Sequence, residues 1–244
     1  MEVKMLRKVL LICGIVSSLL YVAMNVFVPM LYEGYSMASQ TVSELSAIGA
    51  PTRPLWVPLG TVYSLLVAAF GWGIWKSAGR NRLLRIVGGL MVVDGVVSLY
   101  WPPMHLRGAE FTLTDALHIV WSIVTVLLMM LAIGFGAAAL SKRFRLYSIA
   151  TMVILVVFGV LTGMDGPRIA QNLPTPWIGV WERISIAAFM LWVAVLAIIY
   201  YAPRWNVLKT ASREVVILDE QMRVLCEMPS NNHINYAPYG TGPR

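Results

Sequence analysis

The chain has 244 residues, of which 58% are hydrophobic and 13% are charged. Soluble domains carry roughly 25% charged residues, so this composition is typical of membrane proteins and excludes a conventional soluble core. The formal net charge of +7 would suit nucleic acid, but the basic residues form short clusters at the ends of apolar runs. That distribution indicates contact with anionic lipid headgroups. We therefore expect membrane lipids as partners and no nucleic acid.

Six apolar runs are long enough to cross a bilayer, which takes roughly 20 residues. They lie near residues 7–30, 54–76, 83–103, 114–140, 145–164 and 176–202. The pattern predicts an all-α fold, a six-span transmembrane helix bundle at residues 1–203, followed by a tail at residues 204–244. Two apolar segments of the tail, VVIL and RVLC, are separated by four residues and predict a short β-hairpin.

The loops between these runs alternate in charge. One side carries four basic clusters, which contain Lys4, Arg7 and Lys8, then Lys76, Arg80, Arg82 and Arg85, then Lys142, Arg143 and Arg145, and finally Arg204, Lys209 and Arg213. The opposite loops carry single arginines offset by acidic residues. The positive-inside rule therefore predicts that both termini lie in the cytoplasm. We expect a multi-pass membrane protein.

Titratable residues gather near the extracytoplasmic ends of the predicted spans. The stretch MHLRGAEFTLTDALH (104–118) holds two of the three histidines. Asp115 and His118 are three residues apart at the start of the fourth span, so they share one helix face. Glu182 and Arg183 lie near the start of the sixth span, as Asp115 and His118 lie near the start of the fourth. Because ionisable groups within a membrane usually face the bundle interior or a wet cavity, we expect these residues to converge in a polar cluster.

Several of these residues also have a structural interpretation. TVSE, which ends at Glu44, and TLTD, which ends at Asp115, both fit the capping box of a helix N-terminus. Asp94 lies near the middle of the third span, and a hydrogen bond to Asn25 of the first span would account for it. The alternative interpretation of Glu44, Asp115 and Asp94 is that their side chains belong to the polar cluster.

A metal site is a more specific hypothesis for the same region. His105, Asp115 and His118 would supply three nitrogen or oxygen ligands and leave a fourth position open for water, as catalytic zinc sites do. The sequence has no H-E-x-x-H motif, and Asp-x-x-His is common by chance. A divalent metal is therefore one alternative for this cluster, and the cofactor stays undetermined.

Three stretches resemble the motifs of a bacterial and archaeal membrane family known as domain of unknown function 998. They are YSMASQTVSELSAIGAPTRPLW (35–56), MHLRG with TDALH (104–118), and GVWERI (179–184). The resemblance covers roughly residues 8–202 and leaves the tail outside. It implies five family positions, all on the extracytoplasmic side: Ser43, Glu44, His118, Glu182 and Arg183. The family has no established activity to transfer, so the resemblance supports the location of a site and not its chemistry.

The sequence as a whole predicts a non-catalytic membrane protein, an accessory or ligand-binding subunit whose polar cluster lies on the extracytoplasmic side. The long tail indicates a protein partner in the cytoplasm or self-association. The alternative is a metal-assisted hydrolase that acts on a lipid at the outer leaflet. A metal held by imidazole and carboxylate would favour the hydrolase, whereas a fully paired polar cluster would favour a structural role.

Overall fold

The computed structural model describes residues 2–201, with side chains from residue 5 onward. It contains six α-helices, α1 (Glu2–Phe27), α2 (Arg53–Ser77), α3 (Arg82–Val97), α4 (Leu113–Ala139), α5 (Lys142–Ala170) and α6 (Ile178–Tyr201), and two 3₁₀ helices, η1 (Pro29–Leu31) and η2 (Val42–Ser46). No strand occurs within residues 2–201, which confirms the all-α prediction for that part. The predicted hairpin of the tail lies outside the described residues.

Five of the helices are long and apolar enough to cross a membrane, namely α1, α2, α4, α5 and α6. The remaining helix, α3, has 16 residues and is about 24 Å long at 1.5 Å per residue, less than the roughly 30 Å of a bilayer core. The predicted third span continued to residue 103, but the helix ends at Val97. Pro102 and Pro103 follow shortly after, and proline disfavours a continuing helix.

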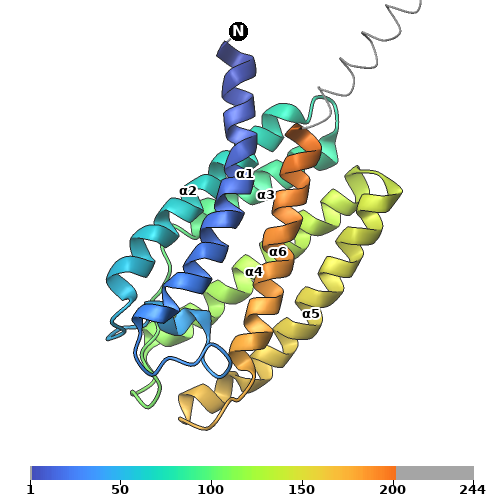
Figure 1. Cartoon of the computed structure of the whole chain (residues 1–244). Helices are drawn as coiled ribbons and strands as arrows, with labels where there is room; N and C mark the ends of the chain where they lie inside the picture. Colours follow the sequence, from blue (N-terminus) through green and yellow to red (C-terminus); the bar gives the residue numbers. More distant parts are fainter. Residues whose placement is uncertain (1, 202–244) are drawn as a thin grey trace, which may run out of the picture. The chain divides into compact units, whose positions relative to one another are not determined.

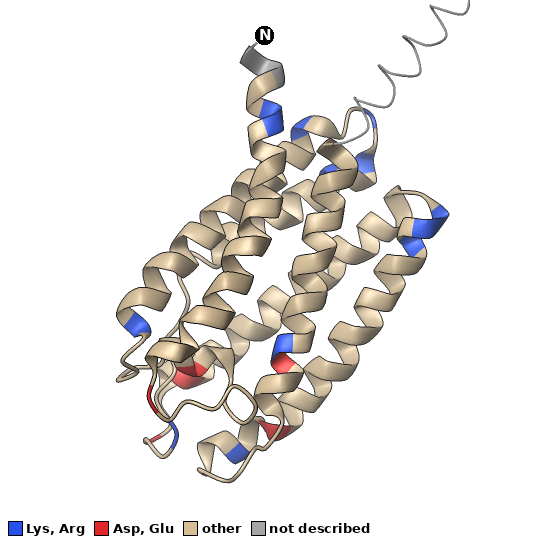
Figure 2. Ribbon diagram, in the orientation of Figure 1, with Lys and Arg blue, Asp and Glu red and all other residues tan. Residues whose placement is uncertain are grey.

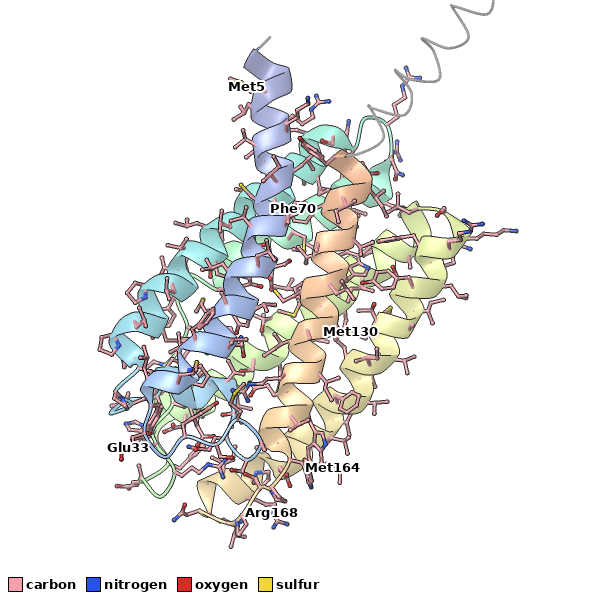
Figure 3. All side chains as sticks on the ribbon, viewed as in Figure 1. Met5, Glu33, Phe70, Met130, Met164 and Arg168 are labelled. Atoms are coloured by element: carbon pink, nitrogen blue, oxygen red, sulfur yellow. The ribbon has the colours of Figure 1, made fainter. Side chains whose placement is uncertain are left out.

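The helices form a closed ring, in which each packs against its neighbours in sequence and α6 also packs against α1 (Figure 1). Every helix contributes a buried apolar side chain to one shared core: Leu11, Phe70, Met91, Ile133, Leu155 and Trp192. Phe70, labelled in Figure 3, packs against α1 at Gly14, where a Cβ atom would lie 2.7 Å from its ring. These side chains fill the centre of the ring.

The contact between α2 and α3 brings their backbones together. A Cβ atom on Gly95 would lie 2.6 Å from both the Ser64 carbonyl oxygen and the Ala68 nitrogen. A Cβ atom on Gly71 would lie 2.7 Å from the carbonyl oxygen of Gly88. Small residues allow such close approach, which favours helix association in lipid, where there is no hydrophobic drive between helices.

The two ends of the ring differ in their loops and charges. At the end that carries the N terminus, the connections 78–81 and 140–141 are short. At the other end the chain forms the longer connections 28–52, 98–112 and 171–177. Figure 2 shows that lysine and arginine dominate the N-terminal end, whereas the acidic residues gather toward the opposite end. The charge alternation read from the sequence therefore corresponds to two distinct ends of one bundle.

Gly95→Ala should destabilise the protein, because the added methyl group meets the backbone of α2 and overpacking costs about 1–3 kcal/mol. Gly159→Ala is the matched control. It lies inside α5 with open space around the new Cβ atom, so the higher helix propensity of alanine should stabilise the helix slightly. Thermal unfolding of both variants in detergent measures the difference. Equal melting temperatures for Gly95→Ala and the wild type would contradict the close packing of α2 and α3.

Candidate functional site: a polar cap at the loop end of the ring

Three loops form what we call the polar cap: residues 28–52, 98–112 and 171–177. The backbone joins the first two, since the Ile48 amide donates to the Met104 carbonyl oxygen at 2.8 Å. The first loop also contacts the start of α6, where the Gly179 amide donates to the Ala38 carbonyl oxygen at 2.9 Å. The cap is therefore one connected structure, and loops far apart in sequence lie side by side in it.

Glu44 lies at the centre of the cap and is 0% exposed. The capping box predicted from TVSE forms here and starts η2. Glu44 Oε2 accepts from the Thr41 amide at 2.7 Å, and the Glu44 amide donates to Thr41 Oγ1 at 3.3 Å. This local motif turns the carboxylate inward, where it becomes available to a cation from another loop.

Arg107 supplies that cation and links all three loops. Its Nε lies 2.6 Å from Glu44 Oε1 and its Nη2 lies 3.0 Å from Glu44 Oε2, a bidentate pair. Nη2 also donates to the Ser39 carbonyl oxygen, and Nη1 donates to Thr175 Oγ1, both at 2.7 Å. Sequence analysis did not select Arg107 as a site residue. Its position in MHLRG, one of the motifs that carry the family resemblance, could have identified it.

Glu182 and Arg183 hold the first loop against α6. Glu182 Oε2 accepts from the Val42 amide at 2.5 Å. Arg183 Nη1 donates to the Met37 carbonyl oxygen at 2.8 Å, and Arg183 Nη2 donates to the Tyr35 hydroxyl at 2.7 Å. Burial raises the pKa of Tyr35 to about 12, although its hydrogen bond from Arg183 opposes the shift. Tyr35 therefore stays neutral at physiological pH and donates to the Thr41 carbonyl oxygen.

Asp115 fixes the second loop on the start of α4. Its Oδ1 accepts from the His105 amide at 2.7 Å, and its Oδ2 accepts from His105 Nδ1 and the Thr112 amide, both at 2.9 Å. Thr112 Oγ1 adds a fourth hydrogen bond at 2.8 Å. The contact from Asp115 to Thr112 is the one that the TLTD motif predicted. An ionised carboxylate can only accept hydrogen bonds, so His105 Nδ1 must carry a proton. The other ring nitrogen, Nε2, takes no part in the contact with Asp115.

His118 does not hydrogen-bond to Asp115, although their spacing places both residues on one helix face. Its Nδ1 donates to the Pro102 carbonyl oxygen at 2.7 Å, and its ring packs edge-to-face on Trp101 with centroids 5.6 Å apart. The structure therefore brings His105 and Asp115 together and directs His118 elsewhere. Among the residues that the structure describes, no three His, Cys, Asp or Glu side chains converge as a metal site would require.

Ser43 and Asp94 stand apart from these interactions. Ser43 lies in η2, half-buried, where its carbonyl oxygen accepts from Ser46 Oγ at 3.0 Å. Asp94 is 3% exposed, and its Oδ1 has no hydrogen-bond partner in the described chain. Asn25 Nδ2 donates to the Tyr21 carbonyl oxygen instead. The hydrogen bond considered between Asn25 and Asp94 is thus absent from the described structure.

The stretches that build the cap are those that carried the family resemblance, and a family model described as "Protein of unknown function (DUF998)" matches residues 15–199. The chain belongs to this family. The match includes α2 to α5 entirely, the second half of α1 and most of α6, and it ends before the tail. No curated protein and no solved structure matches the chain.

Arg107→Ala should be strongly destabilising, because removal of one partner leaves the buried Glu44 carboxylate unpaired, at a cost of about 3–5 kcal/mol. The control is Arg168→Ala. Arg168 lies 3.8 Å from Asp165 and its side chain is 49% exposed, so this loss should cost about 0–1 kcal/mol. Thermal unfolding in detergent measures the melting temperatures of the two variants. If the two variants melt at the same temperature, the ion pair to Glu44 does not hold the cap.

Proposed function

We propose that this chain is a six-span protein of the prokaryotic cytoplasmic membrane, with both termini in the cytoplasm and the polar cap outside. The argument for a sixth span is the position of α3 between its connections. The loop 78–81 lies at the basic end of the ring and residues 98–112 belong to the cap. A chain that passes from one end to the other through α3 has to cross the bilayer. Exposed Leu99 and Tyr100 extend its apolar surface beyond the helix end.

The function that we propose is a non-catalytic accessory or ligand-binding subunit. One observation carries this proposal: the ionisable side chains of the cap are engaged with the loops that they hold. Glu44 is paired with Arg107, Glu182 accepts from the backbone of the first loop, and Arg183 donates to that loop. A general acid or base must be free to exchange a proton with a substrate. Side chains held in this way are better suited to fixing the shape of the cap than to acid–base catalysis.

The metal-assisted lipid hydrolase has one observation in its favour. Asp115 holds His105 through Nδ1, as carboxylates hold metal-binding or catalytic histidines, so that Nε2 is available. The remaining requirements are less well met. Asp115 already accepts four hydrogen bonds, and His118 donates to Pro102 and not toward a shared ion. We therefore rank the hydrolase below the accessory subunit.

The orientation can be tested with single cysteines in a background that lacks Cys13 and Cys226. Ala109→Cys lies in an exposed part of the cap, and Arg143→Cys lies in the exposed first turn of α5, next to the connection 140–141. An impermeant thiol reagent applied to intact cells should label the first variant and leave the second unlabelled until the membrane is permeabilised. The reverse pattern would overturn the proposed orientation.

The partner proposal concerns the tail. Its apolar Val215, Val216, Ile217 and Val224 belong to a segment too short to bury them by itself. Deletion of residues 210–244 should leave the membrane domain folded, with an unchanged melting temperature in detergent, but remove a bound partner or a second copy. Native mass spectrometry of both forms measures the assembly. The same mass of assembly, apart from the tail itself, would exclude the tail as the site of association.

A further inference from the structure

α3 carries one ionisable residue in the interior of the ring, Asp94. It lies on the buried face of α3 with Val87, Met91 and Gly95, and it is 3% exposed. Its Oδ1 has no hydrogen-bond partner within the described chain. The side chain is thus a carboxyl group enclosed by protein, and the cap interactions described above do not use it.

On α3 and on the two described helices that pack against it, α2 and α4, no cation is placed to neutralise this carboxyl group. On α3 the nearest basic residues are Arg82 and Arg85, and Arg85 and Asp94 are nine positions apart, a rise of about 13 Å along the helix. On α2 the basic residues are Arg53 and Lys76, at opposite ends of that helix, and α4 contains neither lysine nor arginine. None of the three ion pairs of the described chain involves Asp94.

The other titratable groups on the two helices packed against α3 give no partner either. On α2 the only one is Tyr63, whose phenol is neutral when protonated. On α4 they are Asp115 and His118, which bond to His105 and Pro102. An ionised Asp94 would therefore be an unpaired charge in a medium of low dielectric constant, which is far more costly than a neutral carboxylic acid.

We propose that Asp94 is a proton-binding site in the interior of the helix ring, which holds one exchangeable proton on its carboxyl group. This inference is independent of the accessory role proposed above, because Asp94 itself takes part in none of the cap contacts. When the proton leaves, the carboxylate remains without a cation. Release must therefore be accompanied by entry of water or of a counter-ion.

The chemistry around Asp94 favours a proton over larger cations. Calcium, magnesium and similar ions need several oxygen ligands, and no three His, Cys, Asp or Glu side chains gather anywhere in the described residues. An organic cation needs space, but next to Asp94 the backbone of α3 touches α2, since a Cβ atom on Gly95 would lie 2.6 Å from Ala68 N. A proton needs a single carboxylate oxygen and no additional volume.

Infrared spectroscopy of the full-length protein in lipid tests this proposal. The spectrum of the wild type minus that of Asp94→Asn should contain the carbonyl stretch of a protonated carboxylic acid near neutral pH. As the pH rises this band should convert to carboxylate bands, with the ratio of the two forms changing about tenfold for each pH unit. Asparagine has the shape of the neutral acid, so the variant should fold. The matched control is Asp165→Asn, which removes a carboxylate lying 3.8 Å from Arg168 and leaves Asp94 in place, so this variant should keep the band that Asp94→Asn removes.

Isotopic labelling of aspartate in the wild type shows, without a variant, whether the protonated band belongs to an aspartate. The chain has four aspartates, Asp94, Asp115, Asp165 and Asp219, and a protonated band that shifts on labelling near neutral pH must come from one of them. Carboxylate bands alone at every pH would overturn the proposal. So would a protonated band that stays constant until the protein unfolds, since that would describe a permanent structural acid with no exchangeable proton.

Discussion

Arg107 and Glu44 form a buried ion pair to which the loop end of the molecule is anchored. Removal of two charges from water is costly, and their mutual attraction compensates only when the remaining donors and acceptors also find partners. Here they do: Glu44 accepts from Thr41 as well as from Arg107, and Arg107 donates to Ser39 and Thr175. The carboxylate and the guanidinium thus tie the first loop, which also buries Val28, Val42 and Leu45 in an apolar cluster, to the other two loops.

The ring and the cap are stabilised by different forces. Lipid tails are as apolar as the helix surfaces, so the helices associate through close packing of small residues and not through the hydrophobic effect. The approach of α2 to α3 at Gly71, Gly88 and Gly95 is the clearest case. The cap lies at the end of the helices, and there charge-assisted hydrogen bonds to backbone carbonyl and amide groups add to the packing of a second, smaller apolar cluster. Glu182 and Arg183 join the two regions, because they belong to α6 and bind the first loop.

The ionisable residues fall into two groups that bear on function in different ways. Those of the cap are hydrogen-bonded to the loops, which favours a structural role. Asp94 is buried, and its Oδ1 has no hydrogen-bond partner among the described residues, which is the arrangement expected of a residue that takes up a proton within a membrane. The proposed accessory role and the proposed proton-binding site therefore rest on separate parts of one family fold.

What the sequence by itself determined is local. Apolar runs predicted the helices, because a helix that faces lipid must be apolar over most of its length. The contacts of Glu44 with Thr41 and of Asp115 with Thr112 were predictable because each joins residues three positions apart. Only the tertiary structure decided the rest. Arg107 and Glu44 are 63 residues apart, and Glu182 and Val42 are 140 apart, and no local pattern encodes which loops meet. His118 illustrates the reason: its helix position was predictable, but its partner, the Pro102 carbonyl oxygen, depends on how the preceding loop folds back over α4.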